Sequence, residues 1–155
     1  MVTKKEMKIL KRSVEEWNHY RLHNLVWVVD FNWCDLTGID LSGADLSECT
    51  FVGATMQYCN LEGADLRWSD LSYTDLRSSD LRNADFKNAV LYCTKLNYAK
   101  FDNCDLRWSK FKPVFSRNIN ISCAKTIFMK GKKSIISNID YTWFMFKHKL
   151  RKGSE

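Results

Sequence analysis

Large apolar residues recur at every fifth position over more than half of the chain. The series runs without a break from Phe31 to Phe111, and Leu or Phe fills most of its positions. A second column, two residues earlier in each unit, runs from Val29 to Ser109 and holds mainly Ala, Cys, Ser and Thr. A period of five fits neither an α-helix, at about 3.6, nor a strand, at about 2. It predicts a coil whose short segments each point one large and one small side chain inward.

Aspartate usually occupies the position between these two columns. Ten of the eighteen acidic residues of the chain stand there, namely Asp30, Asp35, Asp40, Asp45, Asp65, Asp70, Asp75, Asp80, Asp85 and Asp105. The repeat therefore accounts for most of the carboxylates, and we interpret them as part of the coil rather than as catalytic groups.

Units such as Ala44-Asp45-Leu46, Ala64-Asp65-Leu66 and Ala84-Asp85-Phe86 resemble those of pentapeptide-repeat proteins. The resemblance covers residues 29–113 in 17 consecutive units. It implies an all-β solenoid, a right-handed quadrilateral β-helix with four units in each coil. The chain would then form about four and a quarter coils, each rising roughly 4.8 Å if neighbouring coils pair as strands do.

A coil of this kind needs a cover at its ends, because open strand edges promote aggregation. We expect a capping helix over residues 3–24, beginning with a capping box between Thr3 and Glu6. One face of that helix would carry the apolar residues Met7, Leu10, Val14 and Trp17. The alternative is a helix that binds a partner.

The rest of the chain divides into the coil and a C-terminal element. We assign the β-helix to residues 25–130, regular over 29–113 and degenerate over 114–130, since the single proline, Pro113, interrupts the repeat. Residues 131–155 are basic and aromatic, and we interpret them as a cap or a dimer element. A homodimer is therefore one expected state.

The sequence offers no metal, cofactor or catalytic site. Cys34, Cys49, Cys59 and Cys104 all fall in the small inward column, where a free thiol behaves as a small apolar group. Cys93 is expected to face outward, and Cys123 lies in the degenerate part. We therefore predict no metal, no cofactor and no enzymatic activity.

The net charge of +6 conceals an uneven distribution. Residues 31–66 contain six acidic and no basic residues, whereas 112–155 contain ten basic and two acidic ones. The predicted acidic face consists of Asp35, Asp40, Asp45, Glu48, Glu62 and Asp65. The predicted basic tail consists of Lys130, Lys132, Lys133, Lys147, Lys149 and Arg151.

Folding the repeat at 20 residues per coil aligns Asp45, Asp65, Asp85 and Asp105 on one side. The same side carries a candidate partner-binding set: Arg67, Trp68, Lys87, Arg107 and Trp108. Exposed Trp and Arg frequently anchor protein interfaces. The alternative is a structural ladder in which the Arg stems pack over the Trp rings and each Arg pairs with an Asp. A second aromatic group lies on the adjoining sides and comprises Trp33, Tyr58, Tyr73, Tyr92 and Tyr98.

The leading functional hypothesis is a non-catalytic protein-binding module. The family resemblance implies docking on DNA gyrase or topoisomerase IV by mimicry of DNA. Here the acidity is confined to the first coils, so we predict partial mimicry, with modulation or inhibition of a nucleic-acid-handling protein or a phage-type anti-defence target. Alternatives are direct binding of nucleic acid or an anionic membrane through the basic tail, and a structural scaffold.

The sequence has no apolar run of about 18 residues that would predict a membrane-spanning helix. The charged N-terminus does not resemble a secretory signal. We therefore expect a cytoplasmic protein.

Overall fold

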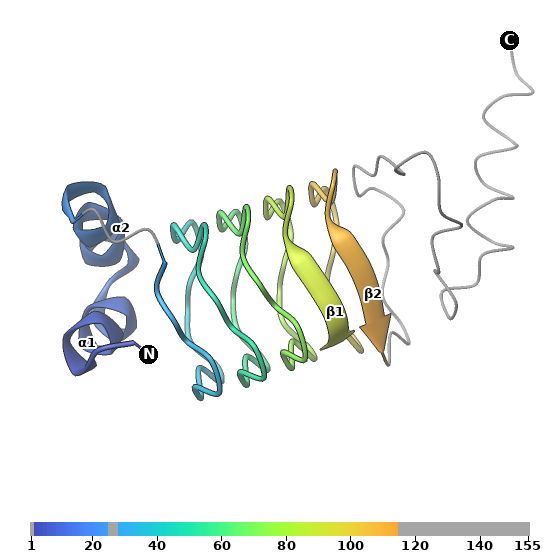
Figure 1. Ribbon diagram of the computed structural model, residues 1–155, viewed down its shortest axis with the longest axis horizontal. Coiled ribbons are helices and arrows are strands. Elements are labelled where there is room, and N and C mark those ends of the chain that lie inside the picture. The colour runs from blue at the N-terminus through green and yellow to red at the C-terminus, as the bar shows by residue number, and fades with distance from the viewer. Residues whose placement is uncertain (1, 25–27, 115–155) are drawn as a thin grey trace, which may run out of the picture.

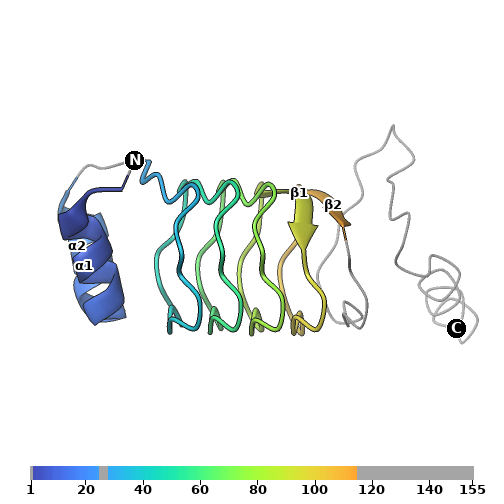
Figure 2. The ribbon, with the colours of Figure 1, turned by 90° about the horizontal axis from the view of Figure 1, so that it is seen from below.

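The computed structural model describes residues 2–24 and 28–114. Two helices lie at the N-terminal end, and a stack of coils extends from them along the long axis of the molecule (Figures 1 and 2). The elements are α1 (Lys4–Arg12), α2 (Val14–His23), β1 (Val90–Lys95) and β2 (Lys110–Val114).

The coil repeats every 20 residues. Parallel bridges join residues 20 apart, from the pair Asp30 and Thr50 to the pair Asp85 and Asp105. The backbone hydrogen bonds follow the same register: the Leu46 amide donates to the Asp65 carbonyl at 2.8 Å, and the Asp65 amide donates to the Ala44 carbonyl at 3.0 Å. The predicted solenoid of four five-residue segments per coil is therefore confirmed over the described residues.

Both inward columns form the core. In the described coils, the large residues from Phe31 to Leu106 are at most 5% exposed. Phenylalanines of successive layers stack, with ring centroids 5.1 Å apart for Phe31 and Phe51 and 5.8 Å for Phe86 and Phe101. The small column leaves room for the turns, and its hydroxyl and thiol groups donate to backbone carbonyls, as Thr74 Oγ1 does to Phe51 at 2.7 Å.

The side chains of the aspartate column form hydrogen bonds within the turns. The carboxylate of Asp45 accepts a hydrogen bond from the Ser47 amide at 3.1 Å, and Asp65 accepts one from the Arg67 amide at 3.0 Å. An Asp or Asn side chain bonded to the backbone two residues later forms an Asx turn. The next residue then takes a positive φ, and this holds at every fifth position from Trp33 to Trp108. The repeat explains the carboxylates, as predicted.

The repeat changes in the unit that begins at Val90. Val90 and Lys95 stand at aspartate positions, and the residues between them form β1, although Cys93 keeps the positive φ (56°) of the turn position. Val90 pairs with Lys110 in a parallel register with β2. Proline has a fixed negative φ, so Pro113 cannot adopt the positive φ of the turn position that it occupies. This restriction ends the regular turn pattern after Trp108.

The N-terminal cap is two helices rather than the single helix expected over 3–24. Ser13 has an extended backbone (φ −160°, ψ 131°), ends α1, and caps α2 by accepting a hydrogen bond from the Glu16 amide at 3.3 Å. The predicted capping box of Thr3 and Glu6 is confirmed at the start of α1. Of the predicted apolar face, Leu10 and Trp17 are buried.

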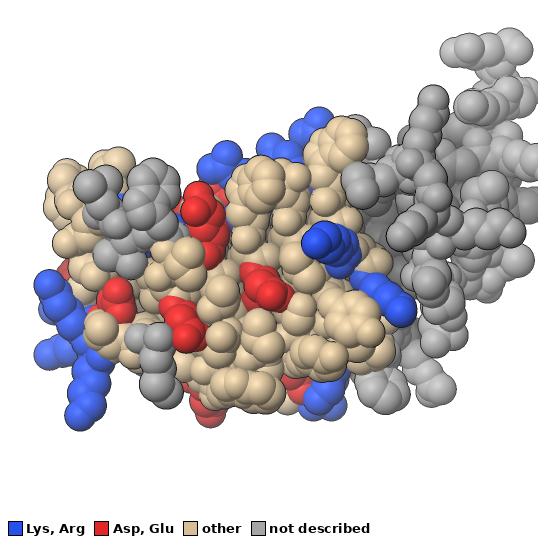
Figure 3. Space-filling view, in the orientation of Figure 1, with Lys and Arg blue, Asp and Glu red and all other residues tan. Residues whose placement is uncertain are grey.

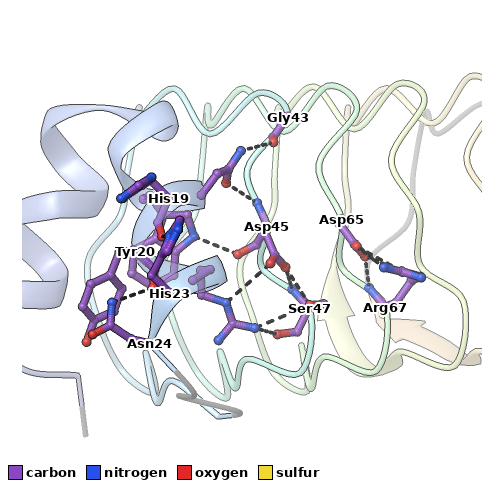
Figure 4. A network of polar contacts seen from close by, with 12 residues as sticks. His19, Tyr20, His23, Asn24, Gly43, Asp45, Ser47, Asp65 and Arg67 are labelled. Atoms are coloured by element: carbon purple, nitrogen blue, oxygen red, sulfur yellow. Dashed lines mark hydrogen bonds and ion pairs between the residues drawn. The ribbon is translucent and has the colours of Figure 1, made fainter.

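The second helix, α2, covers the backbone edge of the first coil (Figure 4). Trp17 Nε1 donates to the Asp45 carbonyl at 2.7 Å, and Arg21 Nη2 donates to the Ser47 carbonyl at 2.6 Å. Asn18 makes two bonds: its Oδ1 accepts from the Asp45 amide at 2.8 Å and its Nδ2 donates to the Gly43 carbonyl at 3.0 Å. These side chains supply the partners that a preceding coil would provide.

Several predictions concern residues outside the described part of the chain. They are the degenerate coil beyond residue 114, the C-terminal element 131–155, Cys123 and the basic tail. The assignment of 131–155 to a cap or dimer element therefore stays a prediction.

Candidate protein-binding surface

The structure brings the five candidate residues onto one side of the coil. The bridges Asp45–Asp65 and Asp65–Asp85, continued by Asp85–Asp105, stack one unit of each coil directly on the next. The residues that follow these aspartates form what we call the Arg–Trp side: Arg67, Trp68, Lys87, Arg107 and Trp108.

The cations of the Arg–Trp side are paired with the aspartates of their own units. Arg67 Nη2 lies 2.6 Å from Asp65 Oδ2, and its Nε donates to Asp65 Oδ1 at 2.8 Å. Arg107 makes the same two-pronged contact with Asp105. The hydrogen bond from Arg107 lowers the pKa of Asp105. Two-pronged pairing fixes the orientation of the guanidinium group and largely neutralises its charge.

Lys87 links two coils of the same side. Its Nζ lies 2.8 Å from Asp85 Oδ2 and 3.9 Å from Asp105 Oδ2. The ladder interpretation is thus correct for the charged groups, because every cation of the Arg–Trp side has an aspartate partner. With its charges internally compensated, this side is a poor surface for binding phosphates.

The two indoles of the Arg–Trp side remain exposed. Trp68 is 63% exposed and Trp108 is 49% exposed. Both stand at positive-φ turn positions, with φ of 64° and 65°. They lie two coils apart, a separation of roughly 10 Å from strand spacing. Among the described residues, neither ring takes part in a ring–ring or cation–ring contact. Two rigidly mounted, uncommitted indoles can therefore fill apolar pockets of a partner.

The predicted acidic residues do not share a single side. Asp35 bridges to Thr55, Asp40 to Asn60, and Asp45 to Asp65, so these units occupy three successive sides of the coil. A spacing of five residues advances the chain by one side in each unit. The acidic group therefore wraps around the first coils instead of forming one flat face.

Only part of this acidic group lacks a cation. Asp45 lies 3.7 Å from Arg21 Nε, Glu62 lies 3.2 Å from Arg82 Nη2, and Asp65 pairs with Arg67. In the described part of the chain, the members without an ion pair are Asp35, Asp40 and Glu48, all in the first coil.

Hydrogen bonds favour the ionised forms of Asp35 and Asp40 in the first coil. Hydrogen bonds from Thr37 lower the pKa of Asp35, and those from Ser42 lower the pKa of Asp40. Acidic groups appear over the first half of the coils in Figure 3, whereas basic groups lie over the later coils and the N-terminal helices. The predicted acidity of the first coils is thus confirmed, whereas the basic segment predicted beyond the last coil lies outside the described residues.

The second aromatic group is exposed as well, at turns and strands of the adjoining sides. Its members are Trp33 (77%), Tyr58 (66%), Tyr73 (55%), Tyr92 (42%) and Tyr98 (61%). Trp33 lies across the next coil, where a methyl group on Gly53 would overlap its ring. Trp33 is therefore held by packing against the coil.

Cys49, Cys59 and Cys104 are buried as the inward column predicts, whereas Cys34 of the same column is half-buried. Burial raises the pKa of Cys49 and Cys104 to about 12 and that of Cys59 to about 11, so these thiols are protonated and poorly nucleophilic at neutral pH. Within residues 2–24 and 28–114, no three His, Cys, Asp or Glu side chains form a group that could hold a metal.

Sequence reasoning missed two sets of residues. Asn18 and Arg21 of α2 bind the coil edge, and no local pattern identifies them, because their role depends on how the helix docks. Among the described residues, Lys110 and Lys112 of β2 have no acidic partner, unlike the other cations of the coil. This difference was visible in the sequence: neither lysine follows an Asp by two or by 20 positions.

No helix in the described part of the chain has the length and apolar character needed to span a membrane. The chain does resemble known repeat proteins. Residues 27–101 match the family model described as a pentapeptide repeat region. No curated protein gives a significant match.

Solved structures of repeat proteins share the fold. The chain is similar to alr5209, a pentapeptide-repeat protein from Nostoc PCC 7120, at 29% identity and a TM-score of 0.57, covering 64% of this chain and 81% of that one. It is also similar to HetL, a pentapeptide-repeat protein from Nostoc sp. strain PCC 7120 involved in regulating heterocyst differentiation. Here the identity is 25% and the TM-score 0.58, covering 74% of this chain and 45% of HetL.

A more distant match is QnrB1, a plasmid-mediated fluoroquinolone resistance protein. It has 18% identity and a TM-score of 0.24, covering 79% of this chain and 89% of that one. A similarity at this level supports no argument about function.

Proposed function

Because the chain belongs to the pentapeptide-repeat family through residues 27–101, we propose that it is a non-catalytic protein-binding module. It would modulate or inhibit a nucleic-acid-handling protein. That target would be an enzyme of the DNA gyrase or topoisomerase type, or a phage-type anti-defence target. We further infer a right-handed, four-sided coil, as is usual for this family.

The pair of exposed indoles on the Arg–Trp side carries the proposal. Trp68 and Trp108 are large apolar groups on a rigid frame, and interface hot spots are enriched in Trp. The frame loses little conformational entropy on binding, because its turns are already fixed by Asx hydrogen bonds. The paired Arg67 and Arg107 would border the indoles as a polar rim.

The acidic first coil supports a limited form of DNA mimicry. Asp35, Asp40 and Glu48 present negative charge with no cation partner among the described residues. A protein site that binds phosphates would attract them. The later coils cannot extend this mimicry, since their cations compensate their carboxylates. We therefore place the acidic end at the edge of the interface and the indoles at its centre.

Inhibition of DNA supercoiling by purified DNA gyrase tests the proposal. The wild-type chain should inhibit supercoiling, and the double variant Trp68→Ala/Trp108→Ala should need about tenfold or more protein for the same effect. The matched control, Trp33→Ala, removes an exposed indole from another side and should inhibit as the wild type does.

Two outcomes of this assay count against the proposal. If the wild type neither binds nor inhibits gyrase or topoisomerase IV, the topoisomerase-type target is wrong. If Trp33→Ala and the double variant lose activity equally, the Arg–Trp side is not the interface. The variant Asp35→Asn/Asp40→Asn tests mimicry alone: unchanged inhibition would refute an electrostatic role of the first coil.

A further inference from the structure

A second surface lies on the side formed by β1 and β2. It consists of Tyr73, Tyr92, Lys110 and Lys112, which we call the tyrosine–lysine patch. These residues come from three successive coils, and all four are exposed. In Figure 3 basic groups lie on the front of the molecule over β1 and β2, beside uncharged surface.

The backbone places these residues in register. The Tyr73 amide donates to the Tyr92 carbonyl at 2.8 Å, and Tyr92 pairs with Lys112 in the parallel β1–β2 ladder. The Tyr73 and Tyr92 rings are 5.9 Å apart and nearly perpendicular, at 77°. Lys112 Nζ lies 5.4 Å from the centre of the Tyr92 ring. The patch thus joins two aromatic rings to ammonium groups on one side of the coil.

The charge of the patch distinguishes it from the rest of the coil. Every Lys and Arg between residues 67 and 107 has an acidic partner, reached by the ion pairs of Arg67, Arg77, Arg82, Lys87, Lys95, Lys100 and Arg107. Lys110 and Lys112 have none among the described residues, so their positive charge is available to a ligand. In the sequence, β2 is followed by residues 115–155, which hold nine basic and two acidic residues.

We propose that the tyrosine–lysine patch binds single-stranded nucleic acid. Unpaired bases would stack on Tyr73 and Tyr92, while Lys110 and Lys112 would contact the phosphates. A base that stacks on Tyr92 displaces the Lys112 ammonium from the ring and frees it to reach the backbone. A duplex fits less well, because its bases are already stacked on one another and cannot lie against the tyrosines.

This site is separate from the Arg–Trp side and does not rest on the proposed function. The cations of the Arg–Trp side are held by their own aspartates, whereas those of the patch have no acidic partner in residues 2–24 and 28–114. The two sites also use different aromatic residues. One can therefore fail without the other.

Fluorescence anisotropy with a labelled 20-nucleotide oligothymidine tests this proposal on the full chain. At low salt the single strand should bind more tightly than a duplex of the same length. Tyr73→Ala should weaken binding to the single strand about fivefold or more. The double variant Lys110→Ala/Lys112→Ala should weaken it further and reduce the slope of log affinity against log salt by about 1.4.

Matched controls separate the patch from general electrostatic attraction. Lys95→Ala/Lys100→Ala removes the same net charge from paired lysines, and Tyr98→Ala removes an equally exposed ring from another side. Both should bind as the wild type does. The proposal would be overturned if the oligonucleotide did not bind, or if duplex and single strand bound with equal affinity. It would also be overturned if patch and control variants lost the same amount of affinity. Preferential binding to anionic vesicles with no binding to the oligonucleotide would overturn it too.

Discussion

Gly53→Ala should destabilise the coil more than the same change at Gly63. The two glycines have nearly the same backbone conformation, with φ of 68° and 67°. A left-handed backbone costs an alanine about 1 kcal/mol or slightly more. The two sites differ in their surroundings: a Cβ at Gly53 would meet three atoms of the Trp33 ring, whereas one at Gly63 would meet nothing within 4 Å.

The contact with Trp33 sets the size of the difference. At Gly63 we expect a loss of about 1 kcal/mol from backbone strain alone. At Gly53 the ring must also leave its place on the coil, and the lost dispersion contacts add about 1 kcal/mol. Because Trp33 is 77% exposed, the ring has solvent to move into, and the chain should still fold.

Urea unfolding followed by far-UV circular dichroism measures both costs. A double-mutant cycle isolates the contact: in a Trp33→Ala background, the variants at 53 and 63 should lose the same free energy of unfolding. The argument would be refuted if Gly53→Ala and Gly63→Ala lowered the free energy of unfolding equally in the wild-type background. It would also be refuted if their difference remained after Trp33 was replaced.

Three further predictions concern the N-terminal cap, the buried thiols and the loss of stability at low pH. Asn18→Ala should lower the free energy of unfolding by about 1–3 kcal/mol, because it leaves the Asp45 amide at the coil edge without its partner; urea unfolding would show this. In the native chain at pH 8, Cys49, Cys59 and Cys104 should resist a thiol-specific disulfide reagent until urea unfolds the coil, and rapid labelling of all three would contradict their burial. Burial raises the pKa of Asp80, but hydrogen bonds from Arg82 and Lys100 outweigh it and lower the pKa to about 2. Since the ordinary value is 3.8, its stabilisation is present above pH 4 and lost toward pH 2, so thermal unfolding of Asp80→Asn should depend less on pH across this range.

The sequence predicted the coil because its period is local and repeated. Each Leu or Phe faces inward for the same reason, and each Asp forms the same turn, so the inward positions from Phe31 to Leu106 follow from the spacing, whereas the 20-residue register was implied by the family resemblance. The capping box of Thr3 and Glu6 was equally visible, since both partners lie within one helical turn.

Features that depend on docking could not be predicted. Ser13 divides the cap into two helices because α2 must turn to cover the coil edge, and a serine is also compatible with a continuous helix. The contacts of Asn18 and Arg21 join residues about 25 positions apart without any repeat to align them. The candidate surface was predicted as a set of residues, but the pairing of each Arg with its own Asp became clear only from the side-chain geometry.

Hydroxyl-radical footprinting of the native chain, alone and with purified DNA gyrase, tests the central claim most directly. All of Trp33, Trp68 and Trp108 are exposed in the free protein, so each should be oxidised there. In the presence of gyrase, Trp68 and Trp108 should be protected while Trp33 reacts as before. Unchanged oxidation of Trp68 and Trp108, or protection of Trp33 alone, would contradict binding through the Arg–Trp side.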